Sequence, residues 1–223
     1  LKEARSIADL NQLLQDVLRD TGKVQEQALQ ARDHLGNARR EVEQAEARIA
    51  ELELELSDMS GQIRTDPLTG ALNRRGFDEL LEKEIARAAR HAHPLAIALL
   101  DLDDFHQTNS EHGHPGGDAV LRHLVTVCQL LLRNSDVVSR IGGDEFVIVM
   151  PETPAADSMS TLLRLQRSLA QRPLHLDEQR VPVHFSAGVT QWQAGDSAEI
   201  VLKRADAALY AAKRVGKNRV QAG

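Results

Sequence analysis

Three acidic residues stand where a buried strand is expected to end. Asp101, Asp103 and Asp104 follow an apolar run that begins after Pro94. Carboxylates at a strand end, beside a backbone carbonyl such as that of Leu102, are suitable ligands for a hard cation such as Mg²⁺. The same residues are also typical of a solvated turn, so this stretch alone does not decide between the two interpretations.

A second acidic pair lies in a glycine-rich turn. The run Gly142-Gly143-Asp144-Glu145 separates two short apolar segments, which is typical of a hairpin. Glycines let a backbone approach a ligand closely, although a plain hairpin turn also explains them. If the hairpin pairs with the strand that ends at Asp101, the carboxylates of Asp101, Asp144 and Glu145 converge. Together they could hold one or two Mg²⁺ ions, which bridge triphosphate oxygens and neutralise developing charge.

Basic residues near the C-terminus are candidates for binding phosphate. Lys213 and Lys217 are four residues apart at the end of an expected helix, so both side chains can reach one point. Basic residues at a helix C-terminus also interact favourably with the helix dipole. Their spacing therefore allows either a phosphate site or an ordinary helix end.

These residues must be positioned by helices and strands, and the order in which the sequence predicts these elements indicates an α+β fold with helices packed on one sheet. Apolar residues at helical spacing predict helices at 77–90, 118–132, 155–171 and 197–215. Short apolar runs predict strands at 95–102, 137–141, 146–150, 181–189 and 218–220. The acidic strand end, the glycine turn and the basic helix end thus belong to separate elements that the fold has to bring together.

Residues 1–63 have a different pattern, in which apolar residues recur in alternating steps of three and four. This segment contains no proline, and every position of the repeat is apolar except Thr21. The positions are Ile7, Leu10, Leu14, Val17, Thr21, Val24, Ala28, Ala31, Leu35, Ala38, Val42, Ala45, Ile49, Leu52, Leu56, Met59 and Ile63. The repeat predicts a parallel coiled coil that joins two copies of the chain through residues 7–63. A helix pair that folds back at Asp20–Gly22 is the alternative.

Composition argues against some classes of protein. A net charge of −6 and an aromatic content of 3% argue against a nucleic-acid-binding surface. No apolar stretch approaches the roughly 20 residues of a membrane-spanning helix, and the single cysteine, Cys128, cannot form an internal disulfide. We therefore expect a cytoplasmic chain. Because it begins at Leu1, we also expect an upstream sensory domain in a longer protein, which could attach it to a membrane.

Five motifs in order give most of the chain a resemblance to a known family. They are Asp66–Arg75 (DPLTGALNRR), Asp101–Phe105 (DLDDF), Asn109 with Gly113-His114 and Gly117-Asp118, Arg140–Phe146 (RIGGDEF), and Ala205–Lys213 (ADAALYAAK) with Gly216–Arg219 (GKNR). The chain from about Asp66 to its end resembles a GGDEF domain, the catalytic domain of diguanylate cyclases. No single motif is specific, but the five together in this order are.

The resemblance implies a GGDEF domain at residues 64–223 whose fold is similar to the adenylyl cyclase and polymerase palm. Such a domain has a mainly antiparallel central sheet with surrounding helices. Each domain would bind one GTP, and two facing domains would form cyclic di-GMP and two pyrophosphates. Mg²⁺ is the implied cofactor, with Mn²⁺ as an alternative. The coiled coil at residues 1–63 would keep two such domains close together.

Carried over by position, the resemblance assigns a metal site to the strand end and the glycine turn. Asp101, the carbonyl of Leu102 and Asp144 would bind Mg²⁺. Glu145 would either join these ligands or deprotonate the attacking 3′-hydroxyl, and the sequence does not separate the two roles.

The GTP site that the resemblance implies is spread over the same motifs. Asn109 and Asp118 would bind the guanine edge, whose N–H donors suit an amide and a carboxylate. The other implied GTP-binding residues are His106, His114, Gly142, Gly143, Lys213 and Lys217, with the two lysines at the β and γ phosphates. His106 stands where the family usually has lysine, and Lys217 where arginine is usual, so phosphate contacts could be weaker.

A second site is suggested by Arg133-Asn134-Ser135-Asp136, which resembles the product-inhibition motif of the family, Arg-x-x-Asp. Arg133 and Asp136 would bind cyclic di-GMP, with Arg164 as a further contact. Without the family, the same two residues are a plausible surface ion pair. They also leave an alternative function open, that of a cyclic di-GMP receptor with weak or no catalysis.

Overall fold

A computed structural model describes residues 63–176 and 179–223. Its elements are α2 (Arg74–His91), β1 (Leu95–Leu102), α3 (Phe105–Leu131), β2 (Val137–Arg140), β3 (Glu145–Pro151), α4 (Ala155–Gln171), β4 (Leu174–Leu176), β5 (Gln179–Val181), β6 (Phe185–Gln191), α5 (Ala198–Arg214) and β7 (Val220–Ala222). Residues 63–223 form a compact unit. The predicted coiled coil, apart from Ile63, lies outside the described residues.

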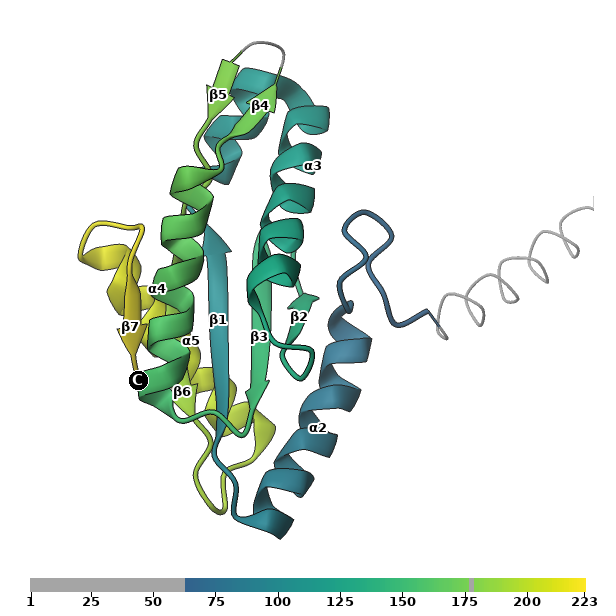
Figure 1. Ribbon diagram of the computed structural model, residues 1–223, viewed down its shortest axis with the longest axis vertical. Helices are drawn as coiled ribbons and strands as arrows, with labels where there is room; N and C mark the ends of the chain where they lie inside the picture. The colour runs from purple at the N-terminus through teal and green to yellow at the C-terminus, as the bar shows by residue number, and fades with distance from the viewer. Residues whose placement is uncertain (1–62, 177–178) are drawn as a thin grey trace, which may run out of the picture. The chain divides into compact units, whose positions relative to one another are not determined.

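A five-stranded sheet forms the centre of this unit, in the order β2-β3-β1-β6-β7 (Figure 1). All neighbouring pairs are antiparallel except β6 and β7, which are parallel. The prediction of a mainly antiparallel sheet surrounded by helices is therefore confirmed. β4 and β5 form a separate two-stranded ribbon near the start of α3 (Figure 1).

The side chains of β1 alternate between two apolar layers, which explains why this central strand is a continuous apolar run. Ala96, Ala98 and Leu100 belong to the layer that contains buried residues of α3 and α4. Leu95, Ile97 and Leu99 belong to the layer that contains buried residues of α2 and α5. Since strand side chains alternate in direction, Asp101 points to the α2 and α5 side of the sheet.

Apart from the helix at 118–132, the predicted helices and the strands at 95–102, 137–141 and 146–150 agree with the structure to within a few residues, but β4 was not predicted and the last strand, predicted at 218–220, lies at Val220–Ala222. Two further elements differ. The helix predicted at 118–132 begins much earlier, at Phe105, and is interrupted at Gly113, whose backbone is not helical (φ 68°, ψ 176°). The strand predicted at 181–189 is wrong as a single element, because β5 ends at Val181 and β6 begins only at Phe185. Pro182 lies between them and has no N–H to donate to a strand ladder.

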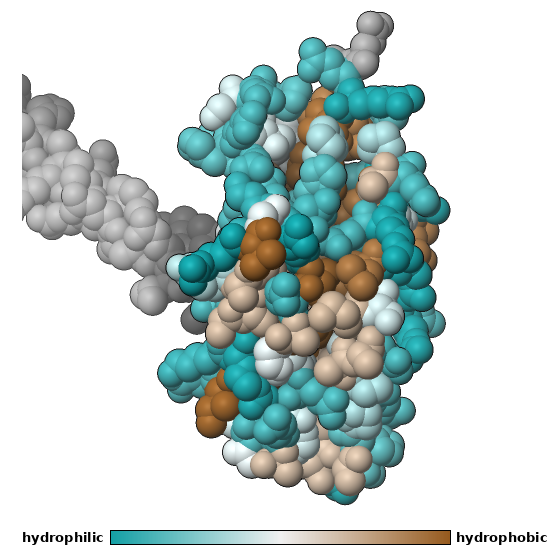
Figure 2. Space-filling view, turned by 90° about the vertical axis from the view of Figure 1, so that its left-hand side faces the viewer, coloured by the Kyte–Doolittle hydropathy of each residue, from teal (hydrophilic) through white to brown (hydrophobic). Residues whose placement is uncertain are grey.

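The surface seen in Figure 2 is mainly hydrophilic, with hydrophobic side chains in small groups. Within the described residues, the large hydrophobic side chains that are exposed are Ile63, Leu130, Leu163, Ile200, Tyr210 and Val215. The described helices include none that is both long and apolar enough to cross a membrane.

Candidate active site

Asp101 and Glu145 lie directly opposite each other in the antiparallel pair β1–β3. Directly opposite residues share one face of a sheet, with Cβ atoms about 5 Å apart. The N–H of Leu102 also donates to the carbonyl of Asp144 at 3.2 Å, which continues the pairing past the strand end. The fold thus joins the acidic strand end to the glycine turn, as the two motifs require.

The Glu145 side chain is folded back against Gly142. A Cβ atom on Gly142 would lie 2.7 Å from Glu145 Oε2, which is closer than van der Waals contact allows. Gly143, by contrast, has no atom within 4 Å of such a Cβ. The first glycine therefore leaves room for the Glu145 carboxylate, and the second leaves open space at the tip of the turn.

Two lysines from the C-terminal region pair with the acidic strand end. Lys213, on α5, makes an ion pair with Asp101 at 2.7 Å, in which the Asp101 side chain is largely shielded from solvent and that of Lys213 is partly exposed. Lys217 makes an exposed ion pair with Asp104 at 2.5 Å. The hydrogen bond with Asp104, followed by the charges of the nearby aspartates, raises the pKa of Lys217. The two lysines predicted to bind phosphate are thus beside the predicted metal site.

Asp103 connects the strand end to the turn that carries Lys217, a role that the sequence did not suggest. Its Oδ1 atom accepts a hydrogen bond from the Ser186 hydroxyl at 2.8 Å. Its Oδ2 atom accepts from the backbone N–H of Asn218 at 2.8 Å. Lys217 and Asn218 both have positive φ angles, 55° and 44°, a conformation that needs support from its surroundings. Asp103 supplies part of that support.

A kink in α3 places Gly117, the neighbour of Asp118, against the predicted guanine-binding residue Asn109. Gly113 turns the backbone away from the first half of the helix, and Gly117 then lies against the Asn109 side chain. A Cβ atom on Gly117 would collide with Asn109 Oδ1 and crowd the Phe105 ring. Asp118 follows directly after Gly117. The amide and the carboxylate are therefore carried by two helix segments in close contact.

The two histidines predicted to bind GTP are exposed on the first half of α3 and at its kink. His106 is exposed, and its backbone carbonyl accepts a hydrogen bond from the Ser110 hydroxyl at 3.0 Å. His114 is exposed directly after Gly113. Their exposure leaves both imidazoles accessible to a ligand, and the structure gives neither a defined role.

The predicted metal-binding carboxylates lie on adjacent elements, but their side chains do not converge on one point. In the parts of the chain that the structure describes, no group of three or more His, Cys, Asp or Glu side chains is close enough to hold a metal. Lys213 occupies one oxygen of Asp101, and Glu145 is turned towards Gly142. The donors are nevertheless oxygen atoms on neighbouring strands, the ligand chemistry that Mg²⁺ prefers. The residues present fit such an ion.

A cleft of about 300 Å³ opens beside Glu145, on the α2 and α5 side of the sheet. Leu99, Ile141 and Leu202 give it an apolar part. Its charged lining residues are Arg74, Glu145, Glu199, Lys203 and Asp206. Glu145 is thus reachable from this side of the domain.

The predicted product-inhibition residues also come together. Arg133 and Asp136 form a tight turn, in which the Arg133 N–H donates to Asp136 Oδ2 at 3.0 Å. Arg164, on α4, reaches the carbonyl of Leu131 at the end of α3 at 3.5 Å. The Arg133 and Arg164 side chains are exposed at this corner. They lie on other elements than the Asp101–Glu145 pair.

Comparisons with known proteins identify the family of this chain. The family model described as "Diguanylate cyclase, GGDEF domain" matches residues 63–219. The chain is 39% identical to the diguanylate cyclase DgcP of Pseudomonas aeruginosa over 166 residues, which are 74% of this chain and 25% of DgcP. It is 32% identical to the diguanylate cyclase DosC of Escherichia coli over 219 residues, 98% of this chain and 47% of DosC.

A solved structure shares the fold as well. The coiled coil and GGDEF domain of DgcB from Caulobacter crescentus, in complex with c-di-GMP, matches with a TM-score of 0.69 and 31% identity. That match covers 82% of this chain and 97% of the DgcB chain. The chain spans less than half the length of DgcP and of DosC. On the family match and these identities, the chain belongs to the GGDEF family of diguanylate cyclase domains.

Proposed function

We propose that this chain joins two GTP molecules into cyclic di-GMP and releases two pyrophosphates. The observation that carries the proposal is the pairing of Asp101 with Glu145 across β1 and β3, with Lys213 held at Asp101. Carboxylates for a divalent cation and a cation for phosphate thus lie at one end of the sheet. This combination suits a reaction at a nucleoside triphosphate.

The binding roles in this proposal are those that the resemblance implies for these positions. Asp101, Asp144 and the carbonyl of Leu102 hold Mg²⁺, or Mn²⁺ in its place. When bound, such an ion neutralises triphosphate charge and polarises the α-phosphate. Asn109 and Asp118, on the two segments of α3 that meet through Gly117, bind the guanine edge.

The remaining contacts concern the triphosphate. Lys213 and Lys217 bind the β and γ phosphates, exchanging their carboxylate partners for phosphate oxygens. Gly142 and Gly143 let the turn approach the triphosphate closely. His106 and His114, exposed on α3, complete the GTP-binding surface.

Glu145 is the group that we assign to proton transfer. The 3′-oxygen of one GTP forms a bond to the α-phosphorus of the other, and the bond from that phosphorus to the bridging oxygen of pyrophosphate breaks. The 3′-hydroxyl proton passes to the Glu145 carboxylate and from there to water. The same step in the opposite direction closes the ring, which requires two domains face to face.

Two further parts of the proposal concern assembly and control. The heptad repeat at residues 7–63 joins two copies, and the DgcB structure, described as a coiled coil and GGDEF domain, supports that arrangement. Arg133, Asp136 and Arg164 bind cyclic di-GMP and inhibit the enzyme. The presence of c-di-GMP in the DgcB complex supports product binding by this family.

The test is incubation of the chain with GTP and Mg²⁺, followed by chromatographic separation of the nucleotides. The unmodified chain and the control Glu82→Gln, an exposed position on α2, should form cyclic di-GMP. Glu145→Gln should form none. Absence of product from the unmodified chain at every protein concentration would contradict the proposal. Tight cyclic di-GMP binding that depends on Arg133 would then favour the receptor alternative.

A further inference from the structure

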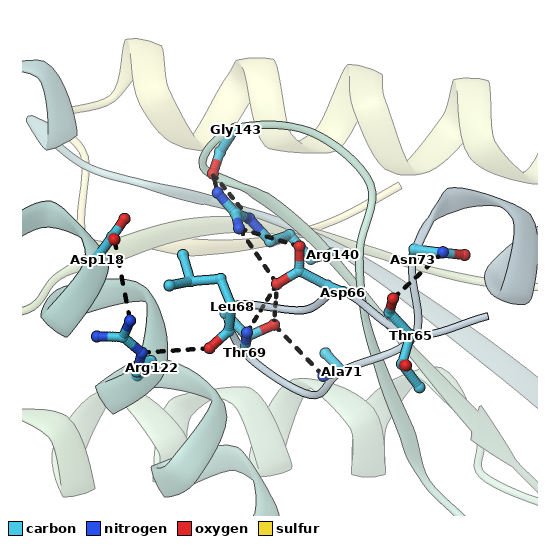
Figure 3. Close-up of polar contacts among 10 residues, drawn as sticks. All are labelled: Thr65, Asp66, Leu68, Thr69, Ala71, Asn73, Asp118, Arg122, Arg140 and Gly143. Carbon is cyan, nitrogen blue, oxygen red and sulfur yellow. Dashed lines mark hydrogen bonds and ion pairs between the residues drawn. The ribbon is translucent and has the colours of Figure 1, made fainter. Parts of the chain in front are cut away.

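One guanidinium connects the glycine turn to the segment that precedes α2. Arg140 Nη1 contacts both carboxylate oxygens of Asp66, each at 3.2 Å. Arg140 Nε and Nη2 donate to the carbonyl of Gly143 at 3.1 and 2.7 Å. Figure 3 shows Arg140 between these two partners. The tip of the glycine turn is thus fixed through a side chain rather than only through the strand ladder.

The contact is built to be rigid. The Arg140 and Asp66 side chains are each only 16% exposed, so their geometry is held by packing as well as by charge. Asp66 Oδ1 also accepts hydrogen bonds from the Thr69 N–H at 2.9 Å and the Thr69 hydroxyl at 2.6 Å. A lysine could not make the same contacts, because only the planar guanidinium of arginine has N–H donors that can reach the Asp66 carboxylate and the Gly143 carbonyl at once.

The same turn also reaches the guanine side of the proposed site. The carbonyl of Leu68 accepts a hydrogen bond from Arg122 Nε at 3.3 Å. Arg122 Nη2 lies 4.0 Å from Asp118 Oδ2, and both side chains are about half exposed. Figure 3 shows Arg122 between Leu68 and Asp118. This second contact is longer and more solvated than the first, so it should be the weaker one.

We propose that the turn at residues 66–70, which we call the brace, positions both sides of the GTP site. Arg140 acts on the glycine turn, and Arg122 acts on Asp118. Both are positioning residues, because each acts through another residue rather than on the substrate. The proposal rests on the proposed function for its catalytic consequence, but the fixing of the glycine turn can be measured without turnover.

The brace also marks where the preceding segment enters the domain. The Asn73 amide donates to the carbonyl of Ile63 at 2.9 Å, and Asn73 Oδ1 accepts from the Gly76 N–H at the start of α2. Leu72 exchanges backbone hydrogen bonds with β2, donating to Val138 and accepting from Arg140. The chain is therefore held on both sides of the brace, so a displacement at Ile63 would reach both arginines.

The first experiment separates substrate binding from turnover. It compares Arg140→Lys and Asp66→Asn with a matched control, Arg75→Lys, whose exposed side chain pairs with Glu79. The binding probe is 3′-deoxy-GTP with Mg²⁺, which lacks the attacking hydroxyl. We expect both brace variants to bind it within about threefold of the unmodified chain, with turnover at saturating GTP lowered about tenfold or more. Equal losses of binding and turnover, or no loss of either, would overturn the assignment of Arg140.

The second variant tests the guanine side. Arg122→Ala should weaken 3′-deoxy-GTP binding about two- to fivefold, the effect expected of an exposed pair, and should leave turnover at saturating GTP within about twofold. Unchanged binding would remove Arg122 from the proposal. A loss of turnover alone in Arg140→Lys and a loss of binding alone in Arg122→Ala would identify two positioning roles. A general loss of stability would not separate the two quantities in this way.

Amide hydrogen exchange tests the brace independently of activity. The N–H groups of Ile141 and Gly142 both donate to the carbonyl of Glu145 across the turn, at 2.9 and 3.3 Å. In Arg140→Lys and Asp66→Asn these two amides should exchange about tenfold faster, while the amide of Ile148 in the middle of β3 is unchanged. If the unmodified chain forms no cyclic di-GMP, the proposed function fails, but hydrogen exchange still shows whether the brace fixes the glycine turn. Unchanged exchange at Ile141 and Gly142 overturns the brace.

Discussion

At the residue scale, the position of the Glu145 carboxylate depends on the missing side chain of Gly142. A methyl group there would lie 2.7 Å from Glu145 Oε2, so Gly142→Ala must displace the carboxylate. We expect Gly142→Ala to lower turnover at saturating GTP about tenfold or more, because a small misplacement of a reacting group is costly. The atoms that have to give way all belong to the Glu145 side chain, including its Cβ at 3.3 Å, so the fold should survive a small shift of that side chain. Steady-state kinetics and thermal unfolding of the same sample check both expectations.

Gly143→Ala is the matched comparison one residue along the turn. A methyl group there meets no atom within 4 Å, so nothing in the chain itself opposes it. If the turn approaches the triphosphate, this variant should raise the KM for GTP and leave the melting temperature unchanged. A GTP KM equal to that of the unmodified chain would argue against a close approach at Gly143.

Asp66 should make the free energy of unfolding larger at neutral pH than at acidic pH. Burial raises its pKa, but hydrogen bonds from Thr69 and the charge of Arg140 outweigh burial, so the pKa lies below the usual 3.8. A lowered folded-state pKa contributes stability above the unfolded-state pKa, and this contribution is lost as pH falls through the folded-state pKa. Asp66→Asn should therefore lower the free energy of unfolding by about 1–2 kcal/mol at pH 7.

The difference should shrink below about pH 4, where the unmodified Asp66 also becomes protonated. Urea unfolding at pH 7 and at pH 3 measures both values. Asp78→Asn, an exposed position on α2, is the control and should change stability by less than about 0.5 kcal/mol at either pH. A gap between Asp66→Asn and the unmodified chain that stays constant with pH would refute this account.

The acidic residues were predictable from the sequence, whereas their partners were not. The sequence predicted a hairpin beside the strand ending at Asp101, but β1 and β3 are continuous apolar runs without alternation, so the register that puts Asp101 opposite Glu145 came only from the structure. The contacts of Arg140 with Asp66 and of Lys213 with Asp101 join residues far apart in the chain. Side-chain periodicity carries no information about such pairs, so they became visible only in the fold.

At the element scale, the kink of α3 was missed because its residues look like a loop. Polar residues, Gly113 and Pro115 dilute the apolar period before Val120, so a helix was predicted only from 118. The helix at Ala155–Gln171 and the strand at Leu95–Leu102 were correct, since both have an undiluted pattern and clear boundaries. The short ribbon β4–β5 has only three residues in each strand, too few for a period to be recognised.

The kink also predicts a substitution that acts on guanine binding. Gly117→Ala would place a methyl group against Asn109 Oδ1 and the Phe105 ring, so the Asn109 side chain has to move away. We expect the KM for GTP to rise about tenfold, with a smaller change in turnover at saturation, because Asn109 acts in binding. Kinetics of Asn109→Ala and of the double variant check the cause.

If Gly117→Ala acts by displacing Asn109, the double variant should be no worse than the worse single variant. Additive losses would mean that Gly117 acts on something other than Asn109. Thr126→Ala, an exposed position in the second half of α3, serves as the control for general effects on the helix.

At the scale of the whole molecule, the proposed reaction needs two GGDEF domains to meet. One domain supplies the groups around its own GTP, and the 3′-hydroxyl that attacks comes from the GTP of the other. Free domains at low concentration meet rarely, whereas a tether holds them at an effective concentration of about millimolar. The heptad repeat at residues 7–63 is the part of the sequence that we expect to supply this tether.

Two prolines in that repeat should therefore reduce activity in a concentration-dependent way. Proline removes a helix hydrogen bond and clashes with the preceding turn, so Leu52→Pro with Leu56→Pro should break the predicted pairing. Specific activity should fall strongly at low protein concentration and recover as concentration rises, because domain encounter becomes bimolecular. Leu54→Ala, which lies outside the repeat, should leave activity unchanged at every concentration. Equal specific activity of the proline variant and the unmodified chain at low concentration would show that the domains meet without the repeat, and the folded-back helix pair would then be the better interpretation of residues 1–63.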